Sequence, residues 1–104
     1  MRIGVPKEIK PREGRVALVP EACGELVRAG HRVAVEQGAG LASGFPDQAY
    51  RDQGVEMLAD AAAVYDFAEL LVKVKEPVGP ELELLQARHL LFCFLHLAAL
   101  PELQ

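Results

Sequence analysis

The stretch Glu69-Leu-Leu-Val-Lys-Val-Lys-Glu-Pro77 decides the fold predicted for this chain. Its length and its β-branched, apolar residues are typical of a strand. With a period of two, Leu70, Val72 and Val74 share one face of that strand, and both lysines lie on the other. The final proline cannot donate a hydrogen bond to a neighbouring strand, so the strand ends near it and Lys75 stands at its carboxyl end.

The two lysines of this strand have two interpretations. In open α/β sheets, ligands bind at the rim formed by the carboxyl ends of the strands, which would make Lys75 a ligand-binding residue. The alternative is a strand near an edge of the sheet, with Lys73 and Lys75 in water. The choice between them depends on the rest of the chain.

Strands and short helices alternate on both sides of this stretch. Pro20 and Asp60 are predicted to begin helices, Asp47 is predicted to cap another, and Gly30 is predicted to end the first. The expected strands cover residues 2–6, 31–36, 54–58 and 89–96, and the expected helices cover 20–29, a segment from 47, 60–65 and 81–86. This alternation predicts an open, mostly parallel α/β sheet with flanking helices, Rossmann-like or flavodoxin-like.

The last of these strands, His89 to His96, is apolar on both faces. A strand of this kind is expected to be covered on both sides of the sheet.

The composition indicates one small globular domain with a single core. The chain has 104 residues, of which 51% are hydrophobic and 25% charged, and its net charge is −4. An acidic chain has no excess of cations to displace the counterions of phosphates, so nucleic-acid binding is not expected. The apolar run Leu90–Leu100 is interrupted by His96 and is too short to span a membrane.

The two cysteines, Cys23 and Cys93, are far apart and have no CxxC spacing. We expect buried thiols in a reducing compartment rather than a disulfide or a metal site. No secretory signal is evident at the amino terminus. The sequence therefore predicts a cytoplasmic protein.

The glycine-rich loop Gly38-Ala-Gly-Leu-Ala-Ser-Gly44 follows a predicted strand, as a dinucleotide-binding fingerprint does. Its spacing is GxGxxxG rather than GxGxxG, and Phe45-Pro46 follows the last glycine. A long helix therefore cannot begin at the position that would bind a phosphate. We predict an ordinary connection and no cofactor-binding residue here.

Arg15 and His96 are the other candidate site residues. An arginine can hold a carboxylate with two parallel hydrogen bonds, although an isolated arginine is often a solvated surface charge. A histidine at the carboxyl end of a strand can exchange protons with a reacting carbonyl, although it can also be a core histidine. Together with Lys75 they would suit a small anionic 2-oxo acid. Glu8 and Glu76 are lesser candidates, since charged loop residues are usually solvated.

Five motifs spread over the whole chain carry a family resemblance: Met1–Lys10 (MRIGVPKEIK), Glu13–Pro20 (EGRVALVP), Gly38–Gly40 with Ser43–Phe45, Val72–Pro77 (VKVKEP) and Phe94–Ala98 (FLHLA). Together they resemble the amino-terminal part of the alanine dehydrogenase family, which is related to NAD(P) transhydrogenases. The resemblance implies NAD-dependent oxidative deamination of L-alanine to pyruvate and ammonium, and the reverse reaction.

The resemblance also implies roles for three residues. In the family the arginine of RVAL and the second lysine of VKVKEP bind the substrate, and the histidine of LHLA is the acid/base. It therefore assigns substrate binding to Arg15 and Lys75 and catalysis to His96.

Two related groups share part of the pattern. The NAD-side subunit of proton-translocating transhydrogenase keeps the opening motif without the histidine, and the saccharopine-type dehydrogenases keep other parts. Lys75 and His96 together favour the amino-acid dehydrogenase.

The resemblance sets expectations for the complete protein. Residues 1–104 would be part of an amino-terminal substrate domain, and NAD would be bound mainly by a Rossmann domain that this chain lacks. We expect a cytoplasmic homo-oligomer, hexameric in full-length form, with no nucleic-acid or membrane partner. We also expect the 104 residues alone to be inactive in hydride transfer.

Overall fold

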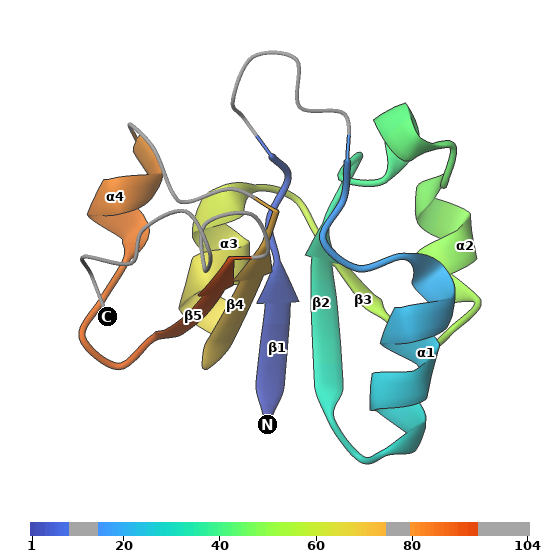
Figure 1. Ribbon diagram of the computed structural model, residues 1–104, viewed down its shortest axis with the longest axis horizontal. Coiled ribbons are helices and arrows are strands. Elements are labelled where there is room, and N and C mark those ends of the chain that lie inside the picture. The colour runs from blue at the N-terminus through green and yellow to red at the C-terminus, as the bar shows by residue number, and fades with distance from the viewer. Residues whose placement is uncertain (9–14, 75–79, 94–104) are drawn as a thin grey trace.

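The computed structural model describes residues 1–8, 15–74 and 80–93, whose strands form one sheet in the order β3-β2-β1-β4-β5 (Figure 1). The strands are β1 (Arg2–Val5), β2 (Arg32–Glu36), β3 (Glu56–Leu58), β4 (Leu70–Lys73) and β5 (Leu90–Cys93). Each neighbouring pair runs parallel. The predicted open α/β sheet is confirmed, and its strand order is Rossmann-like rather than flavodoxin-like.

A helix connects each strand to the next, as expected of parallel strands. The helices are α1 (Pro20–Arg28), α2 (Asp47–Arg51), α3 (Ala61–Phe67) and α4 (Pro80–Leu84), and the 3₁₀ helix η1 (Leu41–Ser43) precedes α2. Helix α1 packs on β2 and α2, and α3 packs on β1, β2 and α4. In Figure 1, α3 lies behind the strands while α1 and α2 lie beside β2 and β3.

The two faces of β4 belong to two different hydrophobic clusters. Val72 joins the larger cluster, which also contains Val5 of β1 and Cys23 of α1. Leu71 joins the smaller cluster with Val64 and Tyr65 of α3. Neighbouring residues of β4 therefore point to opposite faces, as the period-two pattern predicts.

The alternative interpretation of this strand, an edge strand with both lysines in water, is wrong for Lys73. Strand β4 lies between β1 and β5, not at an edge, and the Lys73 side chain is 1% exposed. Its ammonium group pairs with Glu81 and Glu8. The expectation of a solvated Glu8 is wrong for the same reason, while Lys75 and Glu76 lie outside the described residues.

Three of the four predicted helix boundaries are confirmed. Pro20 is the first residue of α1, and Gly30 has a φ of 99° just after that helix, where glycine is favoured. Asp60 caps α3, because its carboxylate accepts the Ala63 N–H at 2.9 Å.

The prediction of a cap at Asp47 is wrong. The N-cap of α2 is Pro46, and Asp47 is the first helical residue. Its carboxylate instead accepts the N–H of Gly38 at 2.9 Å, and so fixes the start of the glycine-rich loop.

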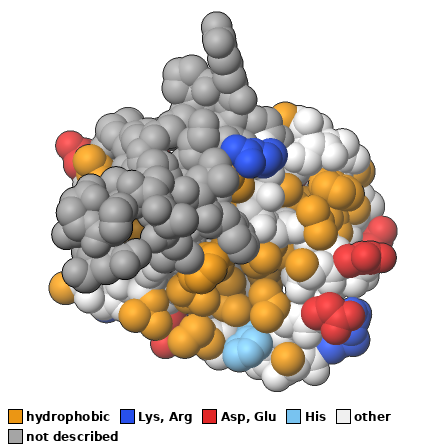
Figure 2. Space-filling model, viewed as in Figure 1, with side chains coloured by type: hydrophobic (Ala, Val, Ile, Leu, Met, Phe, Trp, Pro, Cys, Tyr) orange, Lys and Arg blue, Asp and Glu red, His pale blue; other side chains and the backbone are white. Residues whose placement is uncertain are grey.

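Strand β5 is not covered on both sides in the part of the chain that the structure describes. It is an edge strand, and Leu90, Leu91 and Phe92 are 56%, 43% and 40% exposed. Figure 2 shows the molecule from the same direction as Figure 1, and hydrophobic side chains gather across the lower middle of this face. The apolar pattern alone did not reveal this edge position.

Gly4 of β1 lies close to Val64 of α3 and to Ala68 just after it, and replacing Gly4 with alanine is expected to destabilise the fold. A methyl group there would lie 2.7 Å from Ala68 Cβ and 2.9 Å from Val64 Cγ1. Overpacking of this kind typically costs about 1–3 kcal/mol, so we expect Gly4→Ala to lower the free energy of unfolding in urea by that amount. Gly24→Ala is the control, because its methyl would meet the flexible ends of the Gln53 and Arg28 side chains rather than packed core atoms. Equal stabilities for the two variants would contradict this account of β1.

Candidate functional site

A cavity of about 160 Å³ opens at the carboxyl ends of β1 and β2. Two segments line it, one following β1 and leading to Arg15, the other the glycine-rich loop after β2. The lining residues are Lys7, Glu8, Arg15, Gly38, Ala39, Leu41 and Ala42. The cavity therefore lies at the rim where ligands bind in open parallel sheets.

The polar groups of this cavity suit a small anion. Lys7 and Arg15 supply two cations, and Arg15 is an exposed residue. A guanidinium can hold a carboxylate through two parallel hydrogen bonds. Glu8 is the acidic group in the lining, and its Oε2 atom lies 3.4 Å from the Nζ atom of the buried Lys73.

The segment after β1 is fixed to β2 by a backbone contact. The Lys7 N–H donates to Glu36 Oε1 at 2.9 Å. Burial raises the pKa of the Glu36 carboxyl, while the Lys7 N–H and the Lys7 charge lower it in part. Glu36 thus connects the last residue of β2 to the first charged residue of the cavity.

A buried ionic cluster lies next to the cavity. Lys73 Nζ is 2.9 Å from Glu81 Oε2, and both carboxylate side chains that pair with Lys73 are 3% exposed. The Tyr65 hydroxyl donates to Glu81 Oε2 at 3.4 Å. The pKa of Tyr65 is raised, first by burial and then by the charge of Glu81. The cluster joins β4, α3, α4 and the segment after β1.

The structure places one of the three predicted site residues. Arg15 lines the cavity, while Lys75 and His96 lie outside the described residues. Their convergence with Arg15 therefore stays a prediction. The sequence reasoning did not select Lys7, although its position directly after the first strand, beside Glu8, was a usable signal.

The glycine-rich loop does not have the form of a phosphate-binding loop. After Gly38 the chain forms η1, and α2 begins only after Pro46 and spans five residues. The N–H of Gly38 is already bonded to Asp47. This loop therefore lacks the glycine turn and the long helix that bind the phosphates of a dinucleotide.

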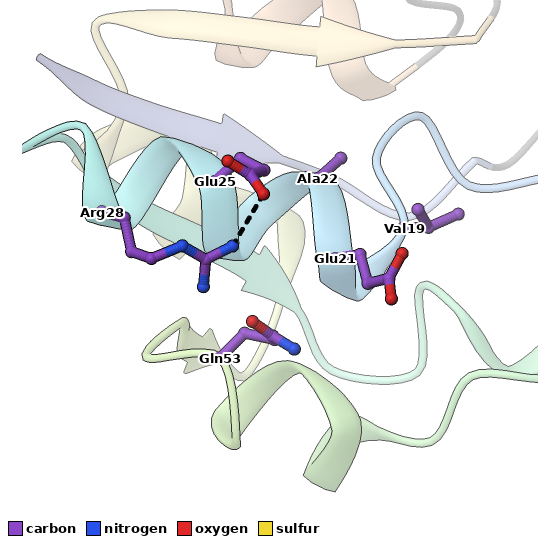
Figure 3. A pocket seen from close by; sticks show the side chains of 6 residues that line it. All are labelled: Val19, Glu21, Ala22, Glu25, Arg28 and Gln53. Carbon is purple, nitrogen blue, oxygen red and sulfur yellow. Dashed lines mark hydrogen bonds and ion pairs between the residues drawn. The ribbon is translucent and has the colours of Figure 1, made fainter.

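A second hollow of about 500 Å³ lies between α1 and α2, and Figure 3 shows the side chains that line it. Its cation, Arg28, is already bonded to Glu25 at 2.9 Å. The other charged residue of its lining is the acidic Glu21. This hollow is thus a poorer candidate for an anionic ligand than the cavity beside Arg15.

Three further findings concern the kinds of site in the described residues. Both cysteines are buried, and burial raises the pKa of Cys23 to about 12, so this thiol is unreactive near neutral pH. Among residues 1–8, 15–74 and 80–93, no group of three or more histidine, cysteine or acidic side chains could hold a metal ion. In the same residues, no helix is both long and apolar enough to cross a membrane.

Known proteins resemble this chain in sequence. The alanine dehydrogenase of Bacillus subtilis is 53% identical over 103 residues, and that of Methanococcus maripaludis is 50% identical over 103 residues. Each match covers 99% of this chain but only 27% and 28% of the relative. The chain therefore spans little more than a quarter of the length of these relatives.

Solved structures agree with the sequence matches. An L-alanine dehydrogenase superposes with a TM-score of 0.89 at 48% identity, covering 99% of this chain and 28% of that one. A transhydrogenase from Sinorhizobium meliloti superposes with a TM-score of 0.80 at 34% identity, covering 88% and 26%. The family model described as "Alanine dehydrogenase/PNT, N-terminal domain" matches residues 4–104. The chain therefore belongs to the family of alanine dehydrogenase/PNT amino-terminal domains.

Proposed function

We propose that residues 1–104 form the amino-terminal substrate domain of an NAD-dependent alanine dehydrogenase. That enzyme converts L-alanine, NAD⁺ and water into pyruvate, ammonium, NADH and a proton, reversibly. The observation that carries the proposal is the position of Arg15 in a small cavity at the carboxyl rim of the sheet, in a chain of this family.

The proposed roles follow from the charges of the three site residues. The guanidinium of Arg15 holds the substrate carboxylate, and the ammonium group of Lys75 polarises the carbonyl of pyruvate. The imidazole of His96 exchanges a proton with the reacting carbonyl, a role suited to histidine because an imidazole side chain ordinarily titrates near neutral pH. Lys75 and His96 enter this scheme from the family motifs VKVKEP and LHLA.

NAD is proposed to bind outside this chain. The loop at Gly38 does not fit a dinucleotide, so a further domain of the complete protein would hold the cofactor and supply the hydride acceptor. The complete protein is proposed to be a cytoplasmic homo-oligomer, hexameric, with L-alanine and pyruvate as its ligands.

The second candidate is the NAD-side subunit of a proton-translocating transhydrogenase. The likeness to the Sinorhizobium meliloti structure favours it. In that case Arg15 and His96 would have no substrate to contact, and their replacement would leave turnover nearly unchanged. The two candidates therefore differ in a kinetic measurement.

The test uses a chimera in which this chain replaces the corresponding 27% of the Bacillus subtilis alanine dehydrogenase. The chimera is expected to reduce pyruvate with NADH and ammonium. Arg15→Ala removes a charge-assisted pair of hydrogen bonds, so the KM for pyruvate is expected to rise roughly 10–100-fold. Arg15→Lys keeps the charge but loses the two parallel hydrogen bonds, so its KM for pyruvate is expected to lie between those of the parent and of Arg15→Ala.

Arg28→Ala is the matched control, because it removes an exposed arginine whose partner is Glu25. Its KM is expected to equal that of the parent chimera. An inactive parent chimera, or an Arg15→Ala variant with the parent's KM, would reject the proposal. The isolated 104-residue chain should show no alanine-dependent formation of NADH.

A further inference from the structure

Glu8 is a charged residue in the interior of the protein. It lies a few residues after β1 and is only 8% exposed, although it lines the cavity that Arg15 also lines. A buried carboxylate is costly unless it is paired and hydrogen-bonded. Its contacts therefore indicate what it does.

Two contacts connect Glu8 to the end of β4. Its Oε2 atom accepts the backbone N–H of Val74 at 3.1 Å and lies 3.4 Å from Lys73 Nζ. Val74 directly follows β4 and directly precedes Lys75 in the sequence. One carboxylate thus joins the exit of β1 to the exit of β4.

Direct binding of the substrate does not explain this residue. A carboxylate beside the cavity repels an anion, and Lys73 offsets that charge only from the buried side. The Val74 contact, by contrast, has a geometric consequence. It holds Glu8, which follows β1, against Val74, the residue that precedes Lys75 in the sequence.

We propose that Glu8 is a positioning residue of the substrate site, holding the segment after β1 against the end of β4 so that Arg15 and Lys75 can reach one substrate molecule. This inference rests on the proposed function. The Lys7–Glu36 contact fixes the same segment to β2, so the exit of β1 is tied to both of its neighbours in the sheet.

The test compares Glu8→Gln and Glu8→Met in the chimera. Both variants remove the charge and keep the side-chain length, but only glutamine retains an oxygen that can accept the Val74 N–H. The loss of one positioning hydrogen bond is expected to raise the KM for pyruvate about tenfold in Glu8→Met, with a smaller change in kcat. The KM of Glu8→Gln is expected to stay close to that of the parent chimera.

Glu81→Gln is the matched control. It disturbs the same buried lysine, at the shorter distance of 2.9 Å, but does not contact Val74. Its KM should stay within about threefold of the parent although its stability falls. Equal KM values for Glu8→Met and Glu8→Gln, or an equal rise in Glu81→Gln, would overturn the positioning role.

Two further outcomes are informative. If Glu8→Met does not fold, Glu8→Asp replaces it, because it keeps the charge but withdraws the carboxylate from Val74 by one methylene group. An unchanged KM in Glu8→Asp contradicts the proposal, and a raised KM supports it. An inactive parent chimera rejects the proposed function, whereas an active parent with insensitive Glu8 variants rejects only the positioning role.

Discussion

Replacing Lys73 with methionine is expected to lower the free energy of unfolding by about 3–5 kcal/mol, the usual cost of removing one partner of a buried ion pair. The ammonium group is 1% exposed and lies within 3.4 Å of two carboxylates, those of Glu8 and Glu81. Methionine has a similar length but no charge. The variant would therefore remove a cation that pairs with two buried carboxylates. Urea unfolding, followed by circular dichroism, measures the change.

A triple variant is the control for this prediction. Lys73→Met combined with Glu8→Gln and Glu81→Gln removes all three charges while keeping the side-chain lengths. It is expected to recover part of the lost stability, since the two carboxylate charges no longer lie buried beside an uncharged methionine. A single variant that loses less than about 1 kcal/mol would show that the cluster contributes no more than a surface ion pair.

The sequence was sufficient for the fold because the relevant signals are local. The period-two pattern around Val72 identifies a strand, and Pro20, Gly30 and Asp60 mark helix ends through their own backbone preferences or hydrogen bonds. Each of these signals acts within a few residues. The alternation of strands and helices then restricts the topology to parallel units.

The burial of Lys73 could not be predicted in the same way. It depends on Glu8, 65 positions earlier in the chain, and on the place of β4 between β1 and β5. A lysine is rarely buried without partners, so a solvated side chain is the reasonable expectation from composition. The prediction that β5 is covered on both sides was also wrong. Its apolar residues predict burial, but they do not show whether a neighbouring strand lies on each side of it.

The candidate site was predicted in part. Arg15 was selected for its chemistry, and the structure places it in a cavity with Lys7, which sequence reasoning had not selected. Lys75 and His96 were selected by motif and by their places at predicted strand ends. Side-chain convergence is a property of tertiary structure, so it requires coordinates or kinetics.

His96→Ala in the chimera is expected to lower kcat for both directions of the reaction by about 10²–10⁴-fold, the usual contribution of a general acid/base. The parent chimera should show a pH dependence of kcat that reflects titration of the imidazole, and the variant should lose it. Added imidazole is expected to restore part of the activity, because it can replace the missing proton carrier.

His89→Ala is the matched control, since His89 is a histidine with a structural role. Its Nδ1 atom accepts the Gln86 N–H at 2.9 Å and its Nε2 atom lies 2.7 Å from the Tyr65 carbonyl oxygen, which fixes both ring nitrogens. This variant is expected to lose stability but to keep kcat and its pH dependence. If His96→Ala keeps the parent's kcat as well, the imidazole at position 96 carries no proton in the reaction. The transhydrogenase-type function would then be the better account of this domain.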